Sequence, residues 1–275
     1  MLKYTLLISG LFVISGGCKP PQKNAAGLTF DPYHYTITKK VEAENGAVVS
    51  AHPLASKAGV SILKSGGNAV DAAIATQLAL AVVYPNAGNL GGGGFMVARL
   101  SNGETVSLDY REMAPGAAHR DMYLNADGKA NMEKSQSGHL SSGVPGTVAG
   151  LFAAHKHGKL PFEKLIQPAI ELAENGFIIT ASEARSLNGL QNDLKKYNSV
   201  MPVFVKSTAW KEGDTLIQKD LANTLRRIQK NGAAGFYEGE TARLIVEEMK
   251  RGNGIINYDD LRNYKAKYRT PHSFD

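Results

Sequence analysis

The sequence predicts an α+β protein whose second half is rich in helix. Three patterns lead to this class: a pair of helical segments near residue 60, a β-hairpin around residue 102, and a run of helical segments from residue 145 onward. Strands followed by helices, with a helical pair in front, favour a sheet layered with helices over an all-helical bundle.

The first helical pair is marked by its end signals. Gly46–His52 is a short apolar run suited to a buried strand, and Pro53 stands where a helix would begin. The glycines at 66 and 67 end that helix, and Asn68 can cap a second one over Ala69–Val83. The second helix is apolar nearly all round, which predicts that it packs on several sides.

A hairpin follows the glycine run at residues 91–94. Phe95–Leu100 and Glu104–Tyr110 alternate apolar and polar residues around a Ser-Asn-Gly turn at 101–103. Lys267–Asp275 has the pattern of an entry into a further strand. The remaining segments carry apolar residues at helical spacing and predict helices over Pro145–His157, Pro161–Asn175, Ser182–Tyr197, Asp220–Asn231, Glu238–Arg251 and Tyr258–Tyr264.

The composition is that of a globular protein. Of 275 residues, 43% are hydrophobic and 20% are charged, which is enough apolar material for one large core. The net charge of +6 comes from Lys and Arg interspersed with Asp and Glu. No continuous basic stripe is present in the sequence, so we expect no nucleic-acid partner.

The first 18 residues predict a bacterial export signal. Lys3 supplies a positive charge, and residues 4–14 form an apolar run too short to span a bilayer. Small residues then lead to Cys18, the single cysteine of the chain, which excludes a disulfide framework within it. We therefore expect an exported protein, in the bacterial periplasm or anchored to a membrane as a lipoprotein.

Cys18 is the expected lipidation site. Small residues before a cysteine resemble a lipoprotein cleavage box, although Ser15 occupies a position that usually holds an aliphatic residue. Ordinary signal-peptidase cleavage near the same place is the alternative. Residues 19–40 then read as a flexible tether, and residues 41–275 as one domain.

Two other motifs have a structural explanation that outweighs the functional one. Gly91–Gly94 lies between a helix and a strand, whereas a phosphate loop lies between a strand and a helix, so we expect a turn where backbones approach closely. His155 and His157 are two apart on a predicted helix and face different sides, which favours a surface pair over a metal site. No Gly-x-Ser-x-Gly elbow supports a serine nucleophile.

Arg111 is the candidate binding residue. It follows the predicted strand directly, at a rigid edge, and its planar guanidinium suits bidentate capture of a carboxylate. An ion pair with Asp109 or Glu112 would explain the same residue structurally. The residues alone leave both interpretations open.

Several motifs together resemble the gamma-glutamyltranspeptidase family, in its order and approximate spacing. The similarity covers nearly everything after residue 41 and rests on Gly66–Ala73, Asn89–Phe95, Arg111–Pro115, Gly143–Gly150, Pro168–Ala173 and Arg269–Pro271. The resemblance implies part of an N-terminal-nucleophile hydrolase, a four-layer αββα sandwich made as a precursor that cuts itself into a large and a small subunit.

The same resemblance implies the activity. In the family, a threonine freed by the cut attacks the gamma-glutamyl amide of glutathione and related compounds, and its own amine serves as the base. Water, an amino acid or a dipeptide amine then accepts the glutamyl group, without a cofactor or metal. The family arginine that binds the glutamyl α-carboxylate corresponds to Arg111.

The motif of the threonine does not occur in these residues, so we expect the nucleophile beyond Asp275 and an inert chain when this part stands alone. Two alternatives remain: an enzyme of the cephalosporin or glutaryl acylase type on the same framework, or a non-catalytic, lipid-anchored remnant.

Overall fold

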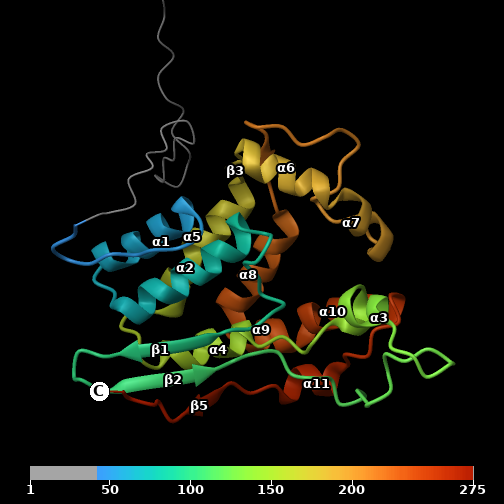
Figure 1. Ribbon diagram of the computed structural model, residues 1–275. Coiled ribbons are helices and arrows are strands. Elements are labelled where there is room, and N and C mark those ends of the chain that lie inside the picture. Colours follow the sequence, from blue (N-terminus) through green and yellow to red (C-terminus); the bar gives the residue numbers. More distant parts are fainter. Residues whose placement is uncertain (1–41, 275) are drawn as a thin grey trace, which may run out of the picture.

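The computed structural model describes residues 42–274, and these form an α+β fold with a helix-rich second half, as predicted (Figure 1). The strands are β1 (Phe95–Arg99), β2 (Thr105–Asp109), β3 (Phe177–Ile178), β4 (Thr215–Leu216) and β5 (Lys267–Arg269). The helices are α1 (Pro53–Lys64), α2 (Ala69–Val83), α3 (Met132–Gln136), α4 (Thr147–His155), α5 (Phe162–Asn175), α6 (Ala181–Gly189), α7 (Gln191–Tyr197), α8 (Lys219–Asn231), α9 (Ala234–Tyr237), α10 (Gly239–Arg251) and α11 (Tyr258–Asn263), with a 3₁₀ turn at His139–Ser141.

The core is a stack of helices. The helix α2 packs against α1 on one side and α5 on another, and α5 packs in turn against α8. The helix α2 is buried nearly all round, as its apolar sequence predicted, and a capping box between Asn68 and Asp71 begins it. This stack is the rigid body against which the hairpin is placed.

The sheet that carries the candidate site is antiparallel, in the order β1-β2-β5. Met96 pairs with Leu108 and Ala98 with Val106, so these four side chains share the face that packs toward the helices. Phe95 and Val97 lie on the opposite face and are 64% and 75% exposed. In the described part of the chain, one face of this sheet is therefore covered and the other is open.

Three predicted elements differ in the structure. Gly46–His52 is not a strand, because it pairs with no strand within residues 42–274. The predicted helix at 182–197 is two helices, α6 and α7, that meet at Leu190. The Gln191 side chain donates to the Leu187 carbonyl at the break, replacing a backbone bond that a continuous helix would have made.

The helix predicted from Pro145 begins two residues later, at Thr147. The Tyr237 hydroxyl donates to the Pro145 carbonyl, and the Gly146 amide donates to the carbonyl of Gly92. Contacts with distant residues thus occupy the backbone groups that would have started the helix earlier.

Candidate functional site

The glycine run at 91–94 packs directly on the start of α4. The Gly92 carbonyl accepts from the amides of Gly146 (2.7 Å) and Thr147 (2.9 Å). The Asn89 side chain oxygen accepts from the Gly92 amide (2.7 Å) and the Thr147 hydroxyl (3.0 Å). The expected close approach of backbones is confirmed, and two of the sequence motifs meet here.

Glycine is required where these backbones meet the end of β2. A methyl group at Gly93 would lie 2.5 Å from the Tyr110 carbonyl oxygen and 2.9 Å from the Arg111 Cα. A methyl group at Gly146 would clash with the same carbonyl oxygen and with the Tyr264 hydroxyl. The backbone at 110 and 111 is therefore enclosed by glycines from two motifs and by Tyr264.

The Arg111 backbone is held on both sides. Its amide donates to Asp109 Oδ1 (3.1 Å), and its carbonyl accepts from the Tyr264 hydroxyl (2.7 Å). The second oxygen of Asp109 receives two bonds from the Arg269 guanidinium, at 3.0 and 2.7 Å. Asp109 is thus the ion-pair partner of Arg269.

The Arg111 side chain is exposed, and its guanidinium forms no ion pair among residues 42–274. The structural alternative, an ion pair with Asp109 or Glu112, is therefore wrong for this part of the chain. What remains is an open, bidentate cation on a rigid backbone, which is suited to binding a carboxylate.

The groups around Arg111 keep fixed protonation states near neutral pH. The hydrogen bond from Arg269 holds the pKa of the Asp109 carboxyl below its usual value, and the Arg111 amide adds to this effect. Burial raises the pKa of Tyr264 to about 12, with smaller contributions from Asp109 and Glu112. Tyr264 is therefore a hydroxyl donor and Asp109 an acceptor at neutral pH.

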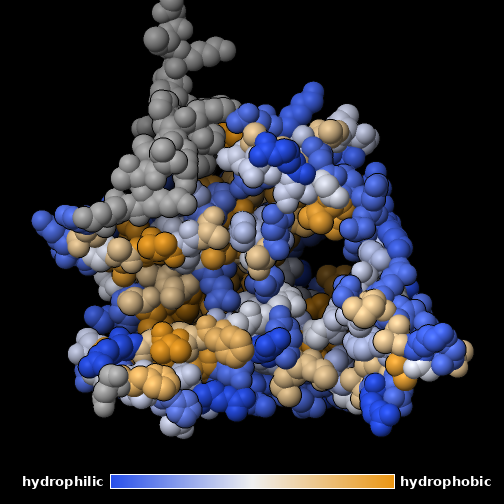
Figure 2. Space-filling view, in the orientation of Figure 1, coloured by the Kyte–Doolittle hydropathy of each residue, from blue (hydrophilic) through white to orange (hydrophobic). Residues whose placement is uncertain are grey.

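A groove of about 1000 Å³ lies between the segment at 45–51, α2 and the start of β1. Gly93, Phe95 and Tyr110 are among its lining residues, and Tyr110 directly precedes Arg111 in the sequence. Figure 2 shows apolar residues gathered in this region, between α1 and β1 in the orientation of Figure 1. The groove and the open face of the sheet share Phe95.

His155 is the last residue of α4, and His157 lies two residues after it. His155 Nε2 lies 2.7 Å from the Leu160 carbonyl, and its ring meets Phe162 edge to face. Both histidines are partly buried, so the expected surface pair is wrong. Across residues 42–274, no three His, Cys, Asp or Glu side chains are grouped as metal ligands.

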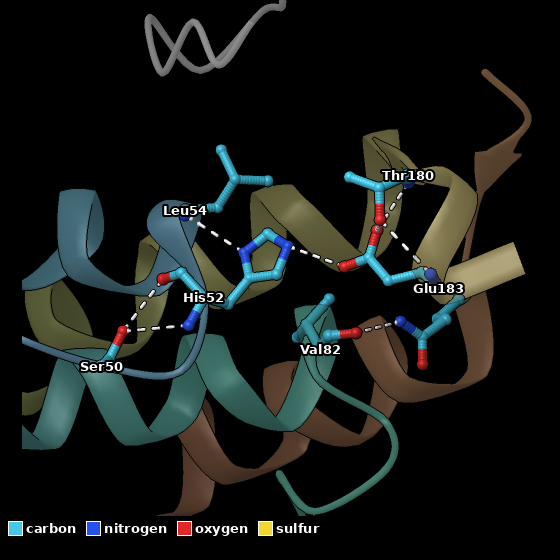
Figure 3. Close-up of polar contacts among 7 residues, drawn as sticks. Ser50, His52, Leu54, Val82, Thr180 and Glu183 are labelled. Carbon is cyan, nitrogen blue, oxygen red and sulfur yellow. Dashed lines mark hydrogen bonds and ion pairs between the residues drawn. The ribbon is translucent and has the colours of Figure 1, made fainter. Parts of the chain in front are cut away.

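A second polar cluster joins α1 to α6 (Figure 3). His52 Nδ1 accepts from the Leu54 amide, so the proton lies on Nε2, which donates to Glu183 Oε1 at 3.0 Å. Glu183 also accepts from the amide and hydroxyl of Thr180 as the capping box of α6. One carboxylate therefore ties the start of α6 to the start of α1.

We expect this carboxylate to make stability depend on pH in acid. Burial raises the pKa of Glu183, but bonds from His52 and Thr180 more than offset this and leave it below the ordinary value of 4.5. Stability from a depressed carboxyl pKa is full above the unfolded value and is lost as the pH falls through the folded value. Glu183→Gln should therefore make the free energy of unfolding, measured by urea unfolding, fall less steeply than in the wild type as the pH drops below about 5. An unchanged pH slope would contradict the assignment.

Comparison with known proteins decides the family. The model of the family described as Gamma-glutamyltranspeptidase matches residues 55–275. The chain belongs to the gamma-glutamyltranspeptidase family. It is 45% identical to the Glutathione hydrolase proenzyme of Escherichia coli (strain K12) over 279 residues, covering 98% of this chain and 46% of that protein. The chain thus spans about half the length of the curated relatives it matches.

Solved structures agree with this assignment. The Helicobacter pylori gamma-glutamyltranspeptidase superposes with a TM-score of 0.82 at 47% identity, over 85% of this chain and 68% of that one. A cephalosporin acylase from Bacillus halodurans superposes with a TM-score of 0.76 at 28% identity, over 90% of this chain and 48% of that one. These two neighbours, a gamma-glutamyltranspeptidase and an acylase, confirm the predicted partial N-terminal-nucleophile hydrolase fold.

Sequence reasoning singled out Arg111 as a candidate but gave no indication of the residues that hold its backbone. Tyr264 lies 153 positions away from Arg111 along the chain and was predicted only as the end of a helix. Asp109 was considered as a partner of the Arg111 side chain, whereas it binds the Arg111 amide. The periodicity of apolar residues in a sequence does not indicate a contact between a side-chain hydroxyl and a distant backbone carbonyl.

Proposed function

We propose that the complete protein is a gamma-glutamyltransferase and glutathione hydrolase. It cleaves the gamma-glutamyl amide of glutathione and related compounds and transfers the glutamyl group to water or to the amine of an amino acid or dipeptide. The observation that carries the proposal is the exposed guanidinium of Arg111, which forms no ion pair within residues 42–274, on a backbone held at both peptide groups. Relatives named glutathione hydrolase proenzymes support it.

Arg111 binds the α-carboxylate of the glutamyl group in this proposal. Two parallel N–H···O bonds orient the substrate, and the side-chain amide then lies at a set distance from the bound carboxylate. The threonine nucleophile, supplied from beyond Asp275, attacks the amide carbon, and its own amine takes the hydroxyl proton and delivers it to the leaving amine. The resulting ester is cleaved by water or an acceptor amine, which restores the threonine hydroxyl.

The small subunit of the same precursor is the proposed partner. The open face of β1-β2-β5 exposes Phe95 and Val97, and the groove beside it opens toward the unpaired segment at 45–51. A sheet face with two large exposed apolar side chains is typical of a surface that another layer covers. On this view residues 42–274 are inert and weakly stable by themselves.

The deciding experiment is an assay of the complete precursor that carries these residues. We expect it to cut itself into two subunits and to release p-nitroaniline from gamma-glutamyl-p-nitroanilide, while residues 42–275 alone show no turnover. Turnover by the isolated part would contradict the placement of the nucleophile. A processed enzyme that cleaves glutaryl-cephalosporin but not the gamma-glutamyl anilide would favour the acylase alternative instead.

Two alternatives have weaker support. The likeness to the cephalosporin acylase is at 28% identity. A glutaryl group carries its carboxylate at the same distance from the scissile amide as a gamma-glutamyl group and lacks only the α-amine, so Arg111 alone does not distinguish the two substrates. The non-catalytic, lipid-anchored remnant is contradicted if the precursor processes itself. The higher identity to a gamma-glutamyltranspeptidase, 47% against 28% for the acylase, supports the gamma-glutamyl substrate.

We also propose that the protein is exported and lipidated at Cys18, a residue that lies outside the described part of the chain. Along residues 42–274, no helix has the length and apolar character needed to cross a membrane. A diacyl anchor holds a protein stably at a membrane where a single chain does not. Cys18→Ala should move the protein from the membrane fraction to the soluble periplasmic fraction. Equal partition of the two forms would support simple secretion.

A further inference from the structure

We propose that Tyr264 and Asp109 are positioning residues that set the direction of the Arg111 guanidinium. The inference rests on the proposed function, in which Arg111 binds the substrate carboxylate. It assigns to two residues outside the Arg111–Pro115 motif a part in substrate binding that they perform without touching the substrate.

Both peptide groups of Arg111 are fixed by other side chains, one of them 153 positions away and one two positions away. The Tyr264 hydroxyl, at the end of α11, donates to its carbonyl at 2.7 Å. Asp109 Oδ1 accepts from its amide at 3.1 Å. Because the side chain is held by no ion pair among residues 42–274, its direction depends on the backbone from which it starts.

The tyrosine is itself held rigidly. The Tyr264 residue is 6% exposed, and its ring stacks on Tyr237 with centroids 6.1 Å apart and planes at 4°. The Tyr237 hydroxyl donates to the Pro145 carbonyl (2.9 Å) and accepts from the Ala149 amide (3.2 Å). The hydroxyl that meets Arg111 is thus anchored to the start of α4.

The aspartate is anchored to the neighbouring strand. Arg269 on β5 binds Asp109 Oδ2 through two nitrogens, at 3.0 and 2.7 Å. Asp109 and its β5 partner Lys267 are opposite one another in the register. The carboxylate therefore connects the position of β5 to the amide of Arg111.

These two contacts matter because the guanidinium lies several bonds from the backbone. A small rotation of either peptide group displaces the Arg111 guanidinium, and a displaced binding group loses much of its effect on the reaction rate. Loss of the Tyr264 hydroxyl would leave the Arg111 carbonyl without this hydrogen-bond donor. Removal of either contact should weaken substrate binding even though the charge of Arg111 is intact.

The test uses the complete, processed enzyme and gamma-glutamyl-p-nitroanilide. Tyr264→Phe removes one hydroxyl, and we expect kcat/KM to fall about three- to tenfold, mostly through KM. Tyr268→Phe is the matched control, because its hydroxyl also donates to a backbone carbonyl, that of Ala153, at 2.9 Å. This control should leave kcat/KM within about twofold.

A double-mutant cycle separates positioning from general stability. In an Arg111→Lys background, Tyr264→Phe should change kcat/KM by less than about twofold, because the fork that it orients is already absent. Full additivity of the two changes would overturn the inference. If Arg111→Lys lowered kcat/KM and Tyr264→Phe did not, the inference would be overturned while the proposed function would stand. If Arg111→Lys left kcat/KM unchanged, the proposed role of Arg111 itself would be lost.

Asp109 supplies an independent arm if Tyr264→Phe fails to fold. Asp109→Ala removes the acceptor for the Arg111 amide, and we expect a rise in KM of about three- to tenfold. Asp109→Asn keeps an acceptor oxygen there and should restore part of the binding. Equal KM values for Asp109→Ala and the wild type would contradict the positioning role.

Discussion

Arg111→Lys should lower kcat/KM for gamma-glutamyl-p-nitroanilide by a factor of about 30 to 1000 in the complete enzyme, equivalent to about 2–4 kcal/mol. Lysine keeps the positive charge but replaces the planar fork with a single ammonium group, so one of the two parallel bonds to the carboxylate is lost. The loss should be seen in KM as well as in kcat, because the contact both binds and orients the substrate. Steady-state kinetics on the processed enzyme measures it.

Arg120→Lys is the control for this change. The Arg120 side chain is 95% exposed and pairs only with the neighbouring Asp121 among residues 42–274, so the same chemical change should leave the kinetics within about twofold. Processing into subunits should be normal in both variants. If Arg111→Lys retained the wild-type kcat/KM, the exposed guanidinium would not be the carboxylate site.

The elements that could be predicted from the sequence are those specified by local pattern. The helix α2 has a capping box and an apolar surface all round, and the β1-β2 hairpin has an alternating second strand after a glycine turn. The structure breaks the predicted helix at Leu190, where both halves keep helical spacing, so periodicity could not show the break. The strands β3 and β4 are two residues each, which is too short for any alternation to be visible.

The candidate site divides in the same way. Arg111 could be singled out as a candidate because it follows a strand within a recognisable motif. The sequence could not show why the Arg111 side chain is open, because this depends on the bond between Arg269 and Asp109, which are 160 positions apart. The close approach of Gly146 to Tyr110 and Tyr264 is likewise a contact between residues distant in the sequence, so it can be recognised only in the folded structure.

Asp71 is the residue whose loss should most reduce stability. It is fully buried, and its carboxylate accepts from the amides of Asn68 (2.8 Å), Lys159 (2.9 and 3.1 Å) and Leu160 (3.4 Å). It therefore closes the start of α2 and fixes the loop between α4 and α5 upon it. Glycine at 158 is part of this arrangement, because a methyl group there would clash with the carboxylate.

Asp71→Ala should lower the free energy of unfolding of the complete protein by about 3–5 kcal/mol, because it leaves up to three partly buried amides without an acceptor, at about 1–3 kcal/mol each. Asp71→Asn keeps one acceptor oxygen but turns an amide group toward backbone donors, so its loss should be smaller. Asp127→Ala, in an exposed loop where Asp127 accepts from the Lys129 amide, should cost less than about 1 kcal/mol. Urea unfolding of the three variants beside the wild type measures the differences. A loss for Asp71→Ala no greater than that of Asp127→Ala would show that the α4–α5 loop is held by its apolar contacts, and that the buried carboxylate is not what joins it to α2.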